Sequence, residues 1–76
     1  MKLTNFDPYP YHVWTVSASG TEPWEGWYEI YEADHKTSRS GPKKLPHLFP
    51  TKDAAHAAAE AEVRREIEHS EHSAGG

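Results

Sequence analysis

The fold of this chain is decided by residues 49–59, FPTKDAAHAAA, and by their continuation to about Glu68. No other segment is long and periodic enough to predict a helix, and alanine has the highest intrinsic helix propensity. Thr51 is a good N-cap because its hydroxyl can accept a hydrogen bond from a free backbone N–H at the helix start. Asp53 in the first turn complements the positive end of the helix dipole. The sequence therefore predicts one long helix that begins just after Thr51.

One face of this predicted helix is apolar and carries small side chains. Four residues at a spacing of four form a stripe, Ala55, Ala59, Val63 and Ile67, and Ala58 and Ala61 widen it. Because alanine side chains are short, we expect the helix axis to lie close to a sheet along this stripe.

The segments before the helix have strand character. Residues 11–17, YHVWTVS, and 26–33, GWYEIYEA, are rich in β-branched and aromatic side chains, and a turn region over 17–23 separates them. This arrangement is typical of an antiparallel hairpin. Residues 45–49, LPHLF, are the candidate third strand, at an edge because proline cannot donate a ladder hydrogen bond.

The predicted fold class is therefore α+β. It consists of a short antiparallel sheet of two to three strands, followed by one long C-terminal helix packed on one face. The expected organisation is an extended lead-in over residues 1–10, a single domain over 11–69 and a disordered tail over 70–76.

Both faces of the predicted hairpin carry aromatic side chains. Alternation groups side chains by parity, and we predict that Trp14, Val16, Tyr28 and Ile30 form the core under the helix. The opposite face then carries Tyr11, Val13, Trp27 and Tyr31. One helix covers only one face, so we predict that the second face is an interface or a stacking surface. Scattered surface aromatics are the alternative interpretation, and exchanging the two faces leaves the same conclusion.

Charge is distributed unevenly along the chain, whose formal net charge is −4. Residues 21–34 carry five acidic side chains and no base, whereas residues 35–52 carry five bases and no acid. We predict that the bases form a nucleic-acid-binding set, Lys36, Arg39, Lys43, Lys44 and Lys52. A solvated loop is the alternative interpretation of the same run.

The size of the chain favours self-association. A folded part of roughly 60 residues is marginally stable, and such domains gain stability from disulfides, a metal or oligomerisation. The 76-residue chain has no cysteine, which excludes disulfides and thiolate metal sites. We therefore predict a homodimer.

No residue pattern predicts catalysis, a cofactor or a metal. The sequence lacks a glycine-rich phosphate loop, a nucleophile elbow and an HExxH motif. Of the six histidines, His69 and His72 lie three residues apart near the end of the helix, but no third ligand is specified. We therefore predict a protein that is not an enzyme and binds no cofactor.

The cytoplasm is the expected location, and no membrane association is expected. Residues 1–8 lack the apolar run of a signal peptide, and no segment approaches the length of a membrane span.

Two sets of residues carry a family resemblance. They are the run of Gly26, Tyr28 and Ile30, and, after a loop, Phe49, Pro50 and Thr51 with Ala54, Ala55 and Ala58. Over roughly residues 11–68 the chain resembles small uncharacterised proteobacterial proteins built as a short antiparallel sheet followed by one helix. It is also similar, more weakly, to HicB-type antitoxins and to double-stranded RNA-binding domains. In the latter, lysines at the helix start contact phosphates; Lys52 matches this pattern, while Asp53 and His56 stand where further lysines are expected.

Two functions follow as hypotheses. The first is a small bacterial regulatory or adaptor module that binds nucleic acid, with the basic set on phosphates and Trp27 and Tyr31 stacking on bases. The second is a protein-interaction or assembly module that does not bind nucleic acid, in which the aromatic face holds a second copy or a protein partner.

Overall fold

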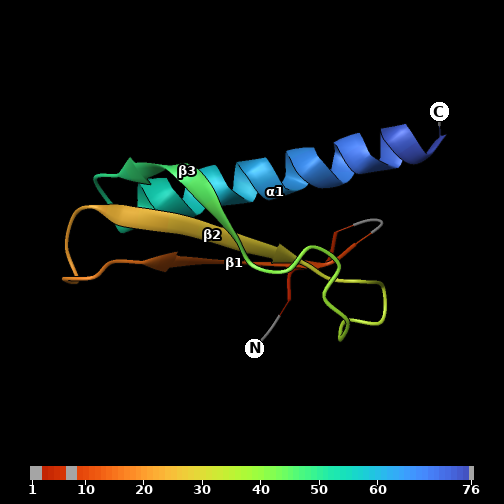
Figure 1. Ribbon diagram of the computed structural model, residues 1–76, viewed down its shortest axis with the longest axis horizontal. Helices are drawn as coiled ribbons and strands as arrows, with labels where there is room; N and C mark the ends of the chain where they lie inside the picture. Colours follow the sequence, from red (N-terminus) through yellow and green to blue (C-terminus); the bar gives the residue numbers. More distant parts are fainter. Residues whose placement is uncertain (1–2, 7–8, 76) are drawn as a thin grey trace.

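The computed structural model describes residues 3–6 and 9–75, and it confirms the α+β fold class. Strands β1 (Tyr11–Val16), β2 (Trp24–Ile30) and β3 (Lys43–Phe49) form one antiparallel sheet in the order β1-β2-β3. Helix α1 (Lys52–Gly75) follows and lies along one side of the sheet (Figure 1). Within the described residues, no helix is long and apolar enough to cross a membrane.

Helix α1 begins where the sequence predicts. The Thr51 Oγ1 atom accepts a hydrogen bond from the Ala54 backbone N–H at 3.1 Å, so Thr51 is the N-cap. The helix ends later than predicted, because it continues beyond Glu68 to Gly75 through most of the segment expected to be a disordered tail. The last residue, 76, and the side chains of residues 70–75 lie outside the described part.

The apolar stripe of α1 packs on the sheet as predicted. Ala55, Ala59, Val63 and Ile67 are all buried, whereas Ala61 is exposed and does not widen the stripe. A Cβ atom at Gly26 of β2 would lie 2.8 Å from the Ala55 carbonyl oxygen. Glycine is therefore required at this point, where the backbones of helix and sheet lie close together.

The face of β1 that packs under the helix is the opposite of the one predicted. Tyr11 stands opposite Ile30 and Val13 opposite Tyr28, so these four side chains share the helix side. Tyr11, Tyr28 and Ile30 are core residues, and Val13 packs against them. The predicted interface positions Tyr11 and Val13 are therefore core positions, and the predicted core positions Trp14 and Val16 lie on the other side. The length of the turn between β1 and β2 sets this register, and a shift of one residue exchanges the faces of a strand.

The third strand is longer than predicted and stands at an edge, as predicted. It starts at Lys43, so Lys43 and Lys44 belong to β3 and not to the preceding loop. Lys43 pairs with Tyr28 and Lys44 with Trp27, which places the two lysines on opposite sides of the sheet.

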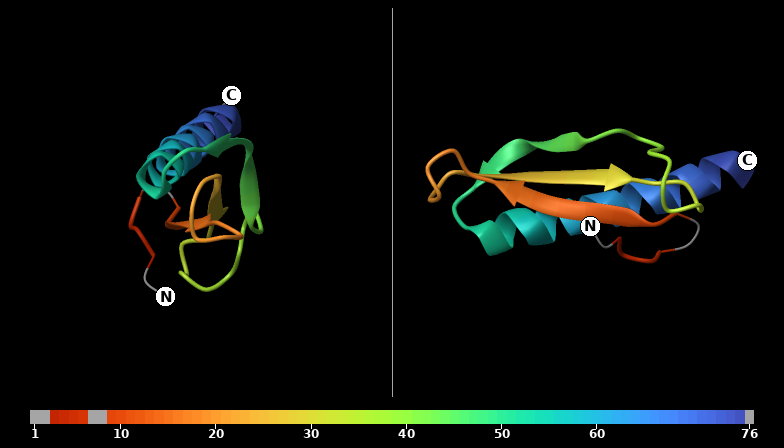
Figure 2. Two further views of the ribbon diagram at one scale, coloured as in Figure 1. Left: turned by 90° about the vertical axis from the view of Figure 1, so that its left-hand side faces the viewer. Right: turned by 90° about the horizontal axis from the view of Figure 1, so that it is seen from below.

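The molecule thus has two layers, one helix and one sheet (Figure 2). Within the described residues, no helix or strand covers the second side of the sheet. We call this side the open face. Its residues are His12, Trp14, Val16, Glu25, Trp27, Glu29 and Tyr31 from β1 and β2, with Lys44 and Leu48 from β3.

Candidate functional site

A ladder of stacked rings runs across the open face. The rings of His12 and Trp14 are stacked with their centroids 5.3 Å apart and their planes at 20°. The rings of Trp14 and Trp27, on neighbouring strands, are stacked at 5.9 Å and 17°. Trp14 and Trp27 are direct cross-strand partners, so the backbone register brings the rings together. The ladder presents a rigid aromatic surface of the kind that anchors protein interfaces.

Carboxylates hold the polar groups of the open face in place. The Trp27 Nε1–H donates to Glu25 Oε1 at 3.0 Å, and the Tyr31 hydroxyl donates to Glu29 Oε1 at 2.9 Å. Burial and the neighbouring Glu29 carboxylate raise the pKa of Tyr31, which keeps its hydroxyl protonated as a donor. The Ser38 hydroxyl donates to the second oxygen of Glu29 and ties the loop after β2 to this face. A shallow depression lies between His12, Trp14, Glu29 and Tyr31.

Apolar side chains extend the open face beyond the ladder. Val16 at the end of β1 is 40% exposed, and Leu48 on β3 is 57% exposed. Leu48 stands opposite Glu25, whose carboxylate accepts the hydrogen bond from the Trp27 ring. The surface therefore combines aromatic, aliphatic and hydrogen-bonded polar groups.

The helix side of the sheet also has polar groups, but they join the sheet to α1. The Tyr11 hydroxyl donates to Glu60 Oε2 at 2.9 Å and accepts from Arg64 Nε at 2.9 Å. The Tyr28 hydroxyl donates to Glu66, whose other carboxylate oxygen accepts from Lys43 Nζ at 2.7 Å.

The ionisation of these groups follows from their contacts. Burial, together with the nearby Glu66 carboxylate, raises the pKa of Tyr28. Burial opposes ionisation of Glu66, but the hydrogen bonds from Lys43 and Tyr28 outweigh it and lower the Glu66 pKa. Both shifts favour a neutral tyrosine donating to a charged carboxylate, which is a strong structural contact.

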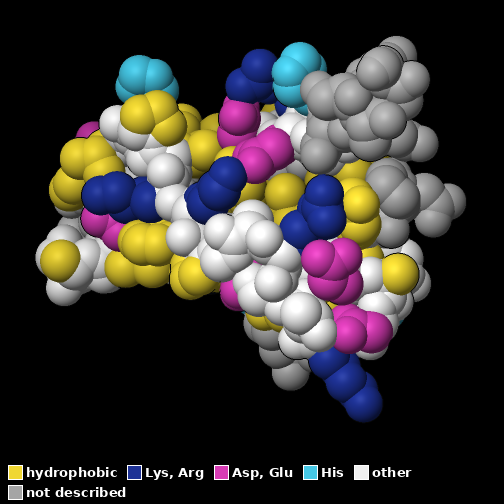
Figure 3. Space-filling view, turned by 45° about the vertical axis from the view of Figure 1, so that its right-hand side comes forward, with side chains coloured by type: hydrophobic (Ala, Val, Ile, Leu, Met, Phe, Trp, Pro, Cys, Tyr) yellow, Lys and Arg dark blue, Asp and Glu magenta, His cyan; other side chains and the backbone are white. Residues whose placement is uncertain are grey.

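The structure does not bring the five predicted nucleic-acid-binding residues together. Lys43 pairs with Glu66 on the helix side, whereas Lys44 pairs with Glu25 on the open face, with Nζ and Oε2 3.9 Å apart. Arg39 pairs with Glu32 at 3.5 Å. Lys36 lies in the turn after β2, and Lys52 is the first residue of α1. On the side shown in Figure 3, basic side chains are likewise interspersed with acidic ones.

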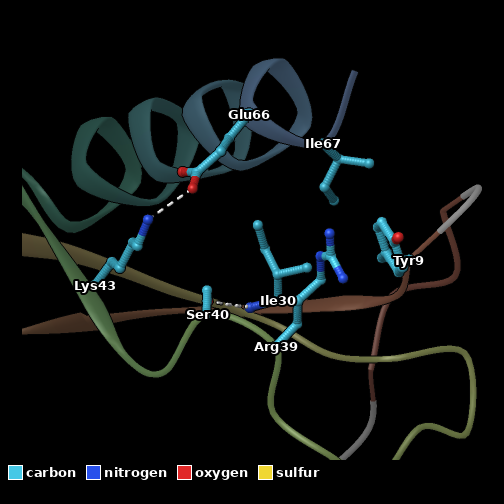
Figure 4. Close-up of a pocket in the computed structure, with 7 residues that line it drawn as sticks. All are labelled: Tyr9, Ile30, Arg39, Ser40, Lys43, Glu66 and Ile67. Carbon is cyan, nitrogen blue, oxygen red and sulfur yellow. Dashed lines mark hydrogen bonds and ion pairs between the residues drawn. The ribbon is translucent and has the colours of Figure 1, made fainter. Parts of the chain in front are cut away.

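A small pocket of about 170 Å³ lies where the loop after β2 meets α1 (Figure 4). The Arg39 guanidinium stacks over the Tyr9 ring at 4.2 Å, and Lys43 reaches Glu66. The Ser40 hydroxyl accepts a hydrogen bond from the Ile30 backbone N–H at 3.0 Å. Lys43 thus has an acidic partner in Glu66 and Arg39 has one in Glu32, and the contact from Lys43 joins β3 to α1.

Among the described residues, no group of three or more histidine, aspartate or glutamate side chains is placed to hold a metal ion. The side chain of His72, considered above with His69, lies outside the described part of the chain.

Two of the four side chains that the sequence predicts for the second face lie on the open face. Trp27 and Tyr31 lie there as predicted, and Tyr11 and Val13 do not. His12 and Trp14 were missed because the parity of β1 relative to β2 depends on the turn between them. The one available signal was the length of residues 17–23, which does not specify a register by itself.

Comparison of the chain with protein-family models, with curated proteins and with solved structures gives no match.

Proposed function

We propose that this chain is a non-enzymatic interaction module that acts as a homodimer, in the manner of a small regulatory or adaptor protein. The strands that carry the open face form the surface through which it associates. The observation that carries the proposal is the stacked ladder of His12, Trp14 and Trp27 on a side of the sheet that no described helix or strand covers.

The chemistry of the open face supports association with protein. Tryptophan and tyrosine are enriched among the residues that dominate binding energy at interfaces, because they bury a large area at a low cost in side-chain entropy. Trp14, Trp27 and Tyr31 are of this kind, and the polar atoms of Trp27 and Tyr31 already have partners within the sheet. Exposed Val16 and Leu48 add apolar area at the margin of the ladder.

The size of the protein supports the same proposal. Among the described residues, the core cluster consists of seven buried side chains, which is a small core for an isolated domain. Association with a second copy adds apolar burial that one helix does not provide.

Sedimentation equilibrium over a wide range of protein concentration tests the proposal. We expect a reversible dimer, weakened by Trp27→Ser because this change removes a ring of the ladder. Trp24→Ser is the matched control, since Trp24 lies on the same strand but pairs with Phe49 on the helix side. A chain that remains monomeric at the highest concentration contradicts the proposal, as does equal weakening by both variants.

A single-stranded nucleic acid is the second candidate ligand. The observation that favours it is the parallel stacking of the Trp14 and Trp27 rings, since exposed rings on a sheet can stack on bases. The carboxylates of Glu25 and Glu29 on the same face oppose it, because they repel phosphates.

Titration of a single-stranded oligonucleotide, followed by tryptophan fluorescence at low and at moderate salt, separates the two candidates. Phosphate-led binding weakens steeply with salt and falls in a Lys43→Ala/Lys44→Ala variant. We expect no quenching at either salt concentration. Quenching that depends on salt and on these lysines supports nucleic acid as the ligand instead.

A further inference from the structure

The two edges of the sheet differ in how they are protected. The β3 edge carries Lys43, Lys44 and Pro46, and lysine and proline at an edge prevent pairing with another strand. The β1 edge, residues Tyr11–Val16 with sequence YHVWTV, has no lysine, proline or carboxylate. It is a regular strand of β-branched and aromatic residues, which is the type of edge that accepts a further strand.

Hydrogen bonding shows which backbone groups of β1 point outward. The Tyr11 N–H and C=O bond to Thr4, at 3.1 and 2.8 Å, on the side away from β2. Residues of an antiparallel strand alternate between the two sides, so the N–H and C=O groups of Val13 and Thr15 also point away from β2. Among the described residues, no backbone group bonds to them on that side.

The free part of this edge has a defined length and centre. At one end, Thr4 occupies the position beside Tyr11, and at the other end the strand stops at Val16. Among the described residues, no backbone group pairs with residues 12–16 on this side, and Trp14 is their midpoint.

We propose that two copies of this chain pair through their β1 edges, antiparallel, around a two-fold axis at Trp14. This inference rests on the proposed function as a homodimer and specifies its geometry: the copies meet at their β1 edges, and their open faces lie side by side and stay uncovered. Val13 of each copy exchanges backbone hydrogen bonds with Thr15 of the other, and the two three-stranded sheets become one continuous sheet.

This register uses the whole free edge and continues the aromatic ladder. Trp14 stands opposite Trp14 of the second copy. The two form a non-hydrogen-bonded pair, in which the Cα atoms lie roughly 4.5 Å apart. The order of rings across the joined open face becomes Trp27, Trp14, Trp14 and Trp27. His12 stands opposite Val16 of the second copy, which covers one of the two exposed large hydrophobic side chains of the described residues. If the second copy is shifted by two residues toward Val16, part of the edge stays unpaired. If it is shifted by two residues toward Tyr11, it collides with the segment at Thr4.

Two single-cysteine variants test this register, and the native chain has no cysteine to interfere. In the proposed dimer, position 12 faces position 16 of the other copy within the Cα distance that a disulfide spans. Position 12 and its own equivalent lie roughly 14 Å apart, at about 3.4 Å per residue, beyond that reach. Mixing His12→Cys with Val16→Cys under mild oxidation is therefore expected to yield the mixed disulfide, and each variant alone little or none. Mass spectrometry distinguishes the three products.

A second variant tests the hydrogen bonds and keeps all tryptophans. Thr15→Pro removes an N–H that points away from β2, so the ladder within the chain stays intact. Because both copies lose a donor at the new pair, we expect the dimer dissociation constant to rise about tenfold or more. Thr15→Ser is the control and is expected to leave the dimer unchanged.

The outcomes separate this inference from the proposed function. A parent chain that is monomeric at every concentration overturns both. A dimer that gives no mixed disulfide, or equal amounts of all three products, overturns only the pairing through β1. A mixed disulfide as the main product, together with weakening by Thr15→Pro, supports the proposed sheet.

Discussion

The two faces of this sheet carry similar numbers of aromatic side chains but use them differently. On the helix side, the rings of Tyr11 and Tyr28 are buried, and their hydroxyl groups reach charged residues of α1. On the open face, His12, Trp14 and Trp27 stack on one another, and their neighbours are residues of the same sheet. The comparison teaches that aromatic content does not distinguish the core face from the open face. The presence of a helix that supplies complementary groups does.

The two faces should differ most in the free energy of unfolding lost when an aliphatic side chain is shortened to alanine. Ile67→Ala should lower the free energy of unfolding by about 2–5 kcal/mol, because Ile67 is 1% exposed and its removal leaves a cavity under α1. Leu48→Ala on the open face should change it by less than about 0.5 kcal/mol. Urea denaturation at a concentration where the chain is monomeric measures both. Comparable losses at the two sites would mean that the open face is part of the folding core.

The next effect concerns the close approach of helix and sheet. Gly26→Ala should cost about 1–3 kcal/mol, since the added Cβ meets the Ala55 carbonyl oxygen at 2.8 Å and backbone must shift to relieve it. The control must change backbone flexibility without a steric clash, and Ala18→Gly in the exposed turn between β1 and β2 does so. Gly20→Ala in that turn is unsuitable because Gly20 has a positive φ. Unfolding midpoints from circular dichroism report the difference. A neutral Gly26→Ala variant would show that α1 can lift from β2 without loss.

The same change made on the two faces sharpens the comparison. Tyr11→Phe removes a hydroxyl that joins Glu60 and Arg64, from a ring that is fully buried, and should cost about 1–3 kcal/mol. Tyr31→Phe removes a hydroxyl that contacts only Glu29 among the described residues, and should cost about 0.5–1 kcal/mol. Paired denaturation curves test the order of the two losses. The reverse order would assign the tighter polar contact to the open face.

The smallest expected effect is the part of the pH dependence that arises on the helix side. The Glu66 pKa is lowered in the folded chain, so the unfolded chain binds more protons in the acidic range. Glu66 therefore contributes stability above its unfolded pKa, about 4.5, and that contribution is lost as the pH falls through the lower folded value. Because Lys43 and Glu66 are partly exposed, the contribution should be below about 1 kcal/mol.

Denaturation at several pH values between about 3 and 7 measures this dependence. The pH values should bracket about 4.5, the pKa of Glu66 in the unfolded chain. Glu66→Gln should flatten the acidic slope, and Lys43→Met should do so in part. The two changes should be non-additive because the residues share one contact. Additive effects would indicate that the slope arises elsewhere.

Much of the architecture was predictable because it depends on local patterns. The Thr51 cap, the stripe of Ala55, Ala59, Val63 and Ile67, and the edge position of the proline-containing strand each follow from spacing or from the chemistry of one residue. The end of α1 was missed because residues 69–75 lack the apolar periodicity by which the helix was identified.

The candidate site was only partly predictable. The basic run from Lys36 to Lys52 looked like one patch in the sequence, yet β3 begins at Lys43 and sends neighbouring lysines to opposite sides. The ladder of His12, Trp14 and Trp27 depends on the cross-strand register, which a single strand does not reveal.

The sequence by itself determined that one alanine-rich helix covers one side of a small sheet and leaves an aromatic side uncovered. That conclusion needs only helix propensity, strand alternation and the number of elements. The tertiary structure alone decided which aromatic residues lie on the uncovered side, which cations are neutralised by acids, and which edge of the sheet is free. These depend on register and on contacts between residues far apart in the chain, because one residue of offset exchanges the two faces of a strand.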